Sequence, residues 1–298
     1  MTLPRQVLPG TFYMLTRRCT QRQFLLRPDT ETNNAFAYCL AEAAQRFEIE
    51  LVVAQQMSNH HHTTFFDRHG RVIEFVAHFH KMLAKCQNAL RGRWENLWST
   101  EPPCLVELVE PTDVIAKALY TATNPVLDDL VERVDHWPGA KMVRAMLRQE
   151  PLEAVRPRHF FRDEGPMPES ARLRFSIPPE LGETDAVLAQ LRDGIARVER
   201  EQLQRRQTTG KRIVGRKAVL RQSWRDAPTT FEPRRNLRPR VAAQSKWYRM
   251  EALGRSQAFV TDYRIARARW LLNEPAVFPP GTYWLVRFAG ATVGALKN

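Results

Sequence analysis

The chain has 298 residues, of which 43% are hydrophobic and 26% are charged, and its formal net charge is +13. This composition is ordinary for a folded protein and excludes disorder throughout the chain. On the usual scale of about 100 to 200 residues per domain, the length indicates one large or two modest domains, and we favour two.

Targeting segments and cysteines restrict the class of protein further. No apolar run approaches the roughly 18 residues that span a bilayer, and the N-terminus has no basic-then-apolar signal region. We therefore expect a cytoplasmic, nucleoid-associated protein with no membrane partner.

The four cysteines, Cys19, Cys39, Cys86 and Cys104, form no CxxC pair. We expect buried free thiols rather than a zinc site or a disulfide framework.

The first 110 residues alternate between predicted strands and helices. A short strand over 11–15 leads into a basic turn with Arg17 and Arg18, and apolar residues at helical spacing predict a helix over 31–46. Two extended runs follow over 49–56 and 60–66, then a helix over 72–90 and a strand over 104–108. This part of the chain therefore contains four predicted strands and two predicted helices.

A last helix completes the predicted N-terminal domain, residues 1–138. It should begin near Thr112 or Asp113, both good N-caps, and end at Asn124, because Pro125 disfavours helical geometry in the residue before it. The resulting order β-α-β-β-α-β-α predicts an α+β fold, an antiparallel sheet with helices packed on it.

The rest of the chain is predicted to have two parts. Residues 139–200 form a connector that leads into a helix over 185–207. Residues 201–298 form a basic, mainly helical extension with a further helix near 246–272. The stretch 200–272 carries 19 basic and 5 acidic side chains, with five interleaved aromatic residues, Trp224, Trp247, Tyr248, Tyr263 and Trp270. Such a surplus attracts a polyanion and the rings can stack on bases, which favours nucleic acid over an ordinary solvated surface.

His60 and His62 are the first candidate site residues. They stand one residue apart on a predicted strand, so both imidazoles should emerge on the same face and can share one metal ion. A polar strand end without any ligand accounts for this pattern equally well. His61 should point to the opposite, core-facing side or be partly exposed.

Tyr120 and Asn124 are the second pair of candidates. Four residues apart on the last helix, they project from one side of it. Two neutral imidazoles and a neutral amide would leave the charge of a divalent cation available to polarise a phosphodiester and a phenol. A core tyrosine and a helix-ending asparagine are the competing interpretation, and spacing alone does not separate the two.

Two segments resemble a known family. Residues 57–62 (MSNHHH) are followed about sixty residues later by residues 120–126 (YTATNPV) and then by Leu130-Val131. This arrangement resembles the REP-associated tyrosine transposases and related single-tyrosine HUH transposases, which show a (P/S)NHxH strand and a YxxxNPV helix end in this order. The resemblance covers roughly residues 9–138. His61 departs from it, since that position is usually hydrophobic.

The resemblance implies a ferredoxin-like HUH endonuclease core with a four-stranded antiparallel sheet. It further implies that His60, His62 and Asn124 bind Mg²⁺ or Mn²⁺, and that Tyr120 attacks single-stranded or hairpin DNA to form a covalent 5′-phosphotyrosine. The expected function is a transposase-like endonuclease and strand transferase. The alternatives are a domesticated, non-cutting DNA-binding protein of the same fold and a phosphodiesterase that activates water instead of a tyrosine.

The basic residues are the expected DNA anchors, and a homodimer is a further expectation. The predicted nucleic-acid-binding residues are Arg17, Arg18, Lys211, Arg212, Arg216, Lys217, Arg234, Arg235, Arg238 and Arg240.

Overall fold

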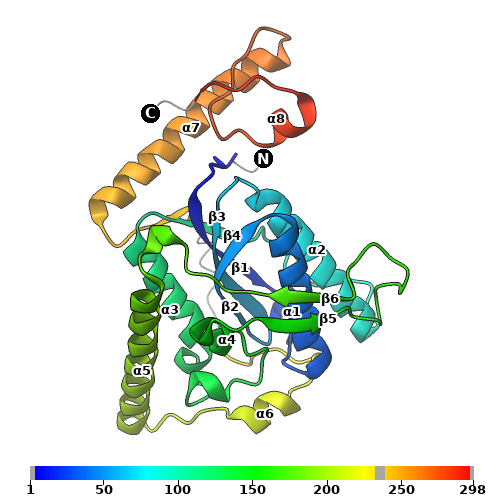
Figure 1. The fold of residues 1–298 in the computed structure, drawn as a ribbon, viewed down its shortest axis with the longest axis vertical. Coiled ribbons are helices and arrows are strands. Elements are labelled where there is room, and N and C mark those ends of the chain that lie inside the picture. The colour runs from blue at the N-terminus through cyan, green and yellow to red at the C-terminus, as the bar shows by residue number, and fades with distance from the viewer. Residues whose placement is uncertain (1–3, 232–238, 296–298) are drawn as a thin grey trace.

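A five-stranded sheet forms the centre of the computed structural model, which describes residues 4–231 and 239–295 (Figure 1). The strands are β1 (Thr11–Arg18), β2 (Ile49–Gln56), β3 (His60–Asp67), β4 (Cys104–Leu108) and β7 (Val241–Ala242), in the order β2-β3-β1-β4-β7. The first four pair antiparallel, as predicted. The short β7 pairs parallel with β4, so the sheet is mixed and the prediction of a four-stranded antiparallel sheet is wrong.

The position of β3 between β2 and β1 fixes the faces of the sheet. In the register with β1, Thr16 lies opposite His62, Arg17 opposite His61 and Arg18 opposite His60. This pairing extends β1 beyond its predicted end. Because side chains alternate along a strand, neighbouring residues of β3 face opposite layers of helices.

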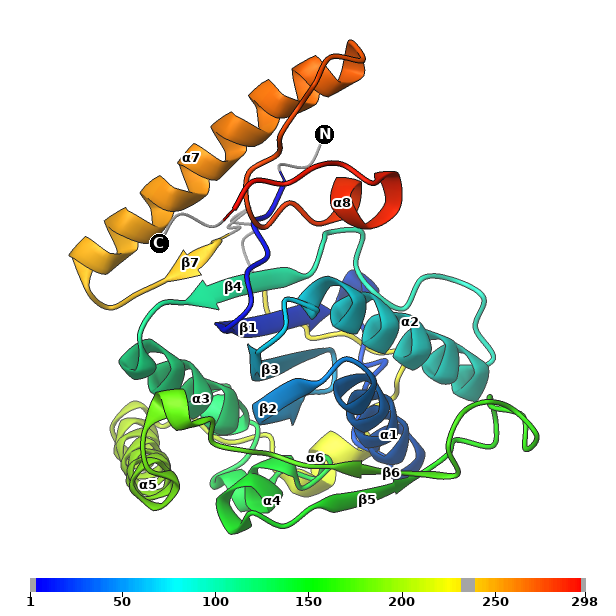
Figure 2. The ribbon, with the colours of Figure 1, turned by 45° about the horizontal axis from the view of Figure 1, so that its top comes forward.

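Helices α1 (Thr30–Arg46) and α2 (Val72–Arg91) cover one face of the sheet (Figure 2). Asp29 caps α1 by accepting a hydrogen bond from the backbone N–H of Thr32. Both helices place aromatic side chains over β3, where Phe36 packs edge-on against His61 and against Phe79. The two helices therefore seal this face as an apolar layer.

Helix α3 (Pro111–Leu127) lies on the other face and carries Tyr120 and Asn124. The prediction that this helix ends at Asn124 is wrong, because Pro125 lies inside its last turn. The backbone N–H groups of Asp128 and Leu130 still reach the carbonyls of Asn124 and Pro125. Asn124, as the residue before a proline, disfavours helical geometry, but burial of Val126 in the core outweighs this local preference.

The N-terminus of α3 also differs from the prediction. Glu110 is the N-cap, and its side chain and that of Asp113 form a reciprocal capping box. Asp113 has a second role, since its carboxylate accepts a hydrogen bond from the backbone N–H of Gln244 at 2.7 Å. The segment that follows β7 is thereby tied to the start of α3.

The predicted connector contains structure that the sequence pattern does not indicate. Beyond the 3-10 turn Val134–His136 and helix α4 (Met142–Arg148), strands β5 (Leu152–Val155) and β6 (Ser170–Leu173) form an antiparallel hairpin against α1. Asn34 of α1 holds this hairpin by two hydrogen bonds with the backbone of Val155. One hydrophobic core runs from Val7 to Val219, across the proposed boundary at residue 138, so the division into domains stays a prediction.

Helix α5 (Thr184–Thr209) packs along the outer side of α3 (Figure 1). Gly194 makes this approach close, because a Cβ atom there would lie 3.0 Å from Cδ2 of Leu119. At the far end, the carboxylate of Asp129 accepts hydrogen bonds from Arg205 at 2.7 and 2.6 Å and pairs with Lys211 at 2.8 Å. The connector to α6 (Arg216–Arg221) therefore docks on the C-terminal end of α3.

The chain ends in the long helix α7 (Lys246–Leu271) and the short α8 (Trp284–Ala289), beyond the β4–β7 edge of the sheet (Figure 2). Arg255 of α7 pairs with Glu107 of β4. The backbone N–H of Val7 donates to the carbonyl of Gly281 at 3.0 Å, so the N-terminal segment also holds this part in place. No helix in the described part of the chain is long and apolar enough to cross a membrane.

The cysteines follow the prediction except at one position. Cys19, Cys39 and Cys86 are buried free thiols. Cys104 is also free but only half-buried, because it opens strand β4 at the edge of the core.

Asp129 provides a test of the attachment of α5. Burial raises the pKa of this carboxyl, but Lys211 and Arg205 outweigh burial and hold the pKa below its ordinary value of 3.8. We expect Asp129→Asn to lower the free energy of unfolding by about 1–3 kcal/mol at neutral pH, as measured by urea denaturation. Asparagine tolerates the left-handed backbone at this position (φ 53°), so backbone strain does not contribute.

The pH dependence has a defined sign. A carboxyl with a depressed folded pKa contributes stability that is complete above about pH 4 and is lost as the pH falls through the folded value. The difference between wild type and Asp129→Asn should therefore vanish in strong acid. Asp193→Asn, an exposed carboxylate of α5 outside the ion pairs of the described residues, is the matched control. Equal destabilisation by both variants would contradict the assignment.

Candidate active site

The three consecutive histidines of β3 divide between the two faces of the sheet. The rings of His60 and His62 lie on the α3 face with centroids 4.8 Å apart. His61 points to the α1–α2 face and is fully buried, which confirms the expected core-facing direction and excludes the alternative of partial exposure. The strand geometry thus brings His60 and His62 together, as the spacing predicts.

His62 has one ring nitrogen engaged and the other without a partner. Its Nδ1 lies 2.7 Å from the hydroxyl oxygen of Thr16, and its Nε2 is buried with no hydrogen-bond partner. Burial, then the positive charges of His60 and its neighbours, hold the pKa of His62 well below its ordinary value of 6.5. The ring is therefore neutral at neutral pH, and when Nδ1–H donates to Thr16, Nε2 presents a lone pair.

His60 is oriented by the residue that precedes it. The side-chain amide nitrogen of Asn59 donates to the carbonyl of Arg22 at 3.1 Å, which turns the amide oxygen toward His60. That oxygen lies 2.7 Å from Nδ1 of His60 and accepts a hydrogen bond from the Nδ1–H group. Both imidazoles of the pair are thus held through Nδ1 by a polar side chain, the arrangement that aims Nε2 at a metal ion.

Tyr120 lies against His62. The two ring centroids are 5.3 Å apart in an edge-on arrangement, and the Tyr120 side chain is 41% exposed. Lys117, one turn earlier on α3, places its ammonium 5.9 Å from the centre of the Tyr120 ring. The phenol therefore stands between an imidazole and a cation at a point that solvent and a substrate can reach.

Asn124 lies one turn further along the same side of α3. It is 2% exposed, and its side-chain oxygen is buried without a hydrogen-bond partner. A buried amide oxygen without a partner costs free energy unless a ligand satisfies it. Together with the unpartnered Nε2 of His62, this oxygen fits the donor set that a divalent cation requires.

The candidate metal ligands, His60, His62 and Asn124, include no carboxylate or thiolate. Within residues 4–231 and 239–295, no group of three or more His, Cys, Asp and Glu side chains is placed to hold a metal ion. The set proposed here has two imidazoles, and its third member is an amide. It leaves the full charge of a bound cation available to a phosphate group.

His61 takes part in a separate buried chain of polar groups. Its Nε2 lies 2.9 Å from Nε2 of His80, and Nδ1 of His80 lies 3.2 Å from a guanidinium nitrogen of Arg17. Burial, then the positive charges of His60 and Arg17, lower the pKa of His61 to about 3. His61 is therefore a neutral core residue rather than a metal ligand.

The predicted nucleic-acid-binding residues differ in exposure and pairing. Arg18 is exposed opposite His60, Arg212 is exposed on the α5–α6 connector, and Arg216 and Lys217 are exposed at the start of α6. Lys211 pairs with Asp129, and Arg17 is half-buried beside His80. Arg240 is half-buried and donates to the carbonyl of Pro4. The other three, Arg234, Arg235 and Arg238, lie outside the described residues.

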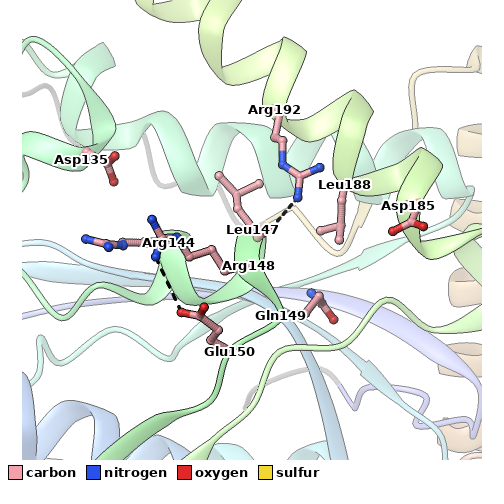
Figure 3. A pocket seen from close by; sticks show the side chains of 9 residues that line it. All are labelled: Asp135, Arg144, Leu147, Arg148, Gln149, Glu150, Asp185, Leu188 and Arg192. Carbon is pink, nitrogen blue, oxygen red and sulfur yellow. Dashed lines mark hydrogen bonds and ion pairs between the residues drawn. The ribbon is translucent and has the colours of Figure 1, made fainter.

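A cavity of about 650 Å³ lies away from this site, between α4 and the start of α5 (Figure 3). Its lining mixes arginine and acidic side chains, and Arg192 there donates to the carbonyl of Leu147 at 2.6 Å. The cavity brings together neither a nucleophile nor a set of metal ligands. The candidate active site is instead the open surface around Tyr120.

The sequence analysis did not assign a role to Thr16, Asn59 or Lys117. The pairing of β1 with β3 brings Thr16 to His62, and the helical repeat brings Lys117 to Tyr120. Asn59 directly precedes the histidines, so its place in the motif was visible. Its bonding to His60 was not, because Arg22 orients its amide.

The chain has a weak similarity to a solved structure. No family model matches the chain, and no curated protein matches it. Among solved structures, the chain is similar to a REP-associated tyrosine transposase bound to a REP hairpin, with a TM-score of 0.42 and 16% sequence identity over 58% of this chain and 98% of that one. This similarity is too weak to establish a shared fold or activity.

The partners of Nδ1 can be tested through metal affinity. We expect Thr16→Val to weaken Mn²⁺ binding by about 10- to 100-fold, because the ring of His62 loses the group that orients it. Thr16→Ser, which keeps the hydroxyl, should bind Mn²⁺ like the wild type. Isothermal titration calorimetry on the folded proteins measures both. Unchanged Mn²⁺ affinity in Thr16→Val would show that Thr16 does not orient a ligand.

Proposed function

We propose that this protein is a metal-dependent DNA endonuclease and strand transferase of the single-tyrosine HUH type, with Tyr120 as nucleophile. The observation that carries the proposal is the contact between the Tyr120 ring and His62, whose buried Nε2 has no protein partner. An accessible phenol beside an unpartnered metal-ligand atom is the arrangement that attack on a phosphodiester requires.

His60, His62 and Asn124 would hold the divalent cation, Mg²⁺ or Mn²⁺. When bound, the cation supplies a positive charge that polarises the scissile phosphate. Two imidazoles favour Mn²⁺ in affinity, whereas availability favours Mg²⁺. The unpartnered side-chain oxygen of Asn124 supports a third ligand from α3.

The chemistry of the chain's own residues balances without a nucleotide cofactor. The phenolic oxygen of Tyr120 forms a bond to phosphorus as the bond to the 3′-oxygen breaks, and the phenolic proton is lost to solvent or to the leaving oxygen. The product is a 5′-phosphotyrosine and a free 3′-hydroxyl. The bond energy is kept in the phosphotyrosine, so a second hydroxyl can reverse the step and join strands.

The charges around the site support DNA as substrate. Arg18 lies opposite His60 in the pairing of β1 with β3, and the ammonium of Lys117 lies 5.9 Å from the centre of the Tyr120 ring, so both cations stand close to the proposed reacting groups. The exposed Arg212, Arg216 and Lys217 extend the positive surface past the end of α3. We propose single-stranded or hairpin DNA as the substrate.

The fold supports the same assignment at a coarser level. The four antiparallel strands β2-β3-β1-β4, with α1 and α2 on one face and α3 on the other, are compatible with a ferredoxin-like HUH core in residues 1–138. In this proposal β7 and α5 are additions to the core: β7 extends the edge of the sheet at β4, and α5 packs on the outer side of α3.

A non-cutting DNA-binding protein is the second candidate function.

Tyr120→Phe separates the two functions. With Mn²⁺ and a labelled single-stranded hairpin, we expect the wild type to form a covalent adduct that is visible on a denaturing gel, and Tyr120→Phe to form none. The substitution removes only a hydroxyl from a side chain that is 41% exposed, so stability should change little. Binding without an adduct in the wild type would support the non-cutting protein, whereas full cleavage by Tyr120→Phe would indicate attack by water.

Loss of the metal ligands should separate cleavage from binding. We expect His62→Ala, or removal of the metal with a chelator, to reduce cleavage at least 100-fold, on the order of the loss when a principal catalytic group is removed. Salt-sensitive DNA binding should persist, because the basic residues remain. Gel-shift assays at two salt concentrations alongside the cleavage assay test this. A parallel loss of binding would contradict the division between site and basic surface.

A further inference from the structure

Arginine and tryptophan side chains stack on one another at the end of β1. The guanidinium of Arg17 lies 5.4 Å from the ring centre of Trp98. Arg93 and Arg225 lie 6.0 and 5.0 Å from the ring centre of Trp224. Residues from three distant parts of the chain therefore contribute to one cluster of cations and indole rings.

The positive charge of this cluster is not neutralised within the described residues. Arg17, Arg93 and Arg225 form no ion pair with a described carboxylate, and the Nε atoms of Arg17 and Arg93 are buried without a hydrogen-bond partner. The contact of Arg17 with His80, a buried imidazole, supplies a hydrogen-bond partner but no negative charge. Arg17 and Arg93 are half-buried and Arg225 is exposed. Guanidinium groups that have no carboxylate partner and remain partly accessible are suited to bind a phosphate.

Two exposed aromatic rings lie on the segments that carry these charges. Trp94, next to Arg93, is 98% exposed. Phe231 is 91% exposed and follows Thr230, whose carbonyl accepts a hydrogen bond from Arg22 at 2.8 Å. Burial of such rings in a partner would be favourable, and their exposure in the free protein has no role in its own packing.

Backbone hydrogen bonds attach the segments of the cluster to the end of β1 and to the turn that follows it. The carbonyl of Leu97 accepts from Thr20, and that of Arg18 accepts from Ser99, which fixes the 93–99 loop along the end of β1. Phe24 donates to the carbonyl of Asp226, which fixes the 222–231 segment. The same turn connects to the site, because Asn59 bonds the carbonyl of Arg22 and the ring of His60.

We propose that this arginine–tryptophan surface, formed by Arg17, Arg93, Trp94, Trp224, Arg225 and Phe231, binds unpaired nucleotides of a DNA strand that runs to the active site. The guanidinium groups contact phosphates and the exposed rings stack on bases. Paired bases cannot stack on these rings, so the surface discriminates single strand from duplex. The inference rests on the proposed function for the identity of the nucleic acid as DNA.

The test measures binding alone, in a protein that cannot cleave. In the Tyr120→Phe background with chelator present, fluorescence anisotropy gives the Kd for a single-stranded DNA oligonucleotide without self-complementarity and for a duplex of equal length. We expect Trp94→Ala and Phe231→Ala each to raise the single-strand Kd by about 5- to 100-fold, and the duplex Kd by less than about 2-fold. Neither exposed side chain supports the fold, so thermal unfolding should be unchanged.

Trp284→Ala is the matched control, because this ring is also exposed (58%) but belongs to α8 and stacks on Phe288. It should leave the single-strand Kd unchanged. An unchanged single-strand Kd in the Trp94→Ala/Phe231→Ala double variant would overturn the proposal. So would an equal loss in Trp284→Ala, an equal loss of duplex binding, or full displacement of the oligonucleotide by polyglutamate.

Contact can be located directly by ultraviolet crosslinking of an oligonucleotide that contains 5-bromodeoxyuridine, followed by mass spectrometry. Crosslinks at Trp94 or Trp224 are expected, and crosslinks confined to α7 or α8 would overturn the assignment. These readouts do not depend on cleavage. A protein that binds single strands through this surface but forms no adduct would leave the inference standing and refute the proposed function.

Discussion

The alternation of side chains along β3 is the constraint on which the rest of the site depends. It separates three consecutive histidines into two environments, with His60 and His62 facing α3 and His61 facing α1 and α2. Because β3 pairs on both sides, a slip by one residue would exchange these faces and break both ladders. The same register places Thr16 opposite His62, so one set of backbone hydrogen bonds positions both the proposed ligand and the hydroxyl beside its Nδ1.

The histidines on both faces of the sheet are buried, but their hydrogen-bond partners differ. His61 and His80 satisfy each other and form part of the core, whereas His62 keeps one buried nitrogen without a partner. Burial lowers the pKa of all three rings, so charge does not distinguish the core histidines from the proposed ligand His62. The distinguishing feature is an unsatisfied polar atom in a place where a ligand can complete it.

Helix α3 is held in place by residues from the second half of the chain. Asp113 near its start bonds Gln244, Asp129 beyond its end pairs with Arg205 and Lys211, and α5 packs along its side at Gly194. Part of the basic charge of the extension is thus used to attach this helix rather than to meet a polyanion. A uniform basic tail for DNA binding is therefore too simple a description of residues 201–298.

The sequence by itself determined the α+β class, the order of the first seven elements, and the sharing of one strand face by His60 and His62, because hydrophobic periodicity and strand alternation are local properties. The helix that carries Tyr120 and Asn124 was also foreseen. Its continuation through Pro125, the fifth strand and the β5–β6 hairpin were not, since long-range packing and pairing override weak local preferences. Only the tertiary structure shows that Tyr120 contacts His62 and that Arg93 contacts Trp224. The residues of each pair are far apart in the chain, and distance along the chain does not determine distance in space.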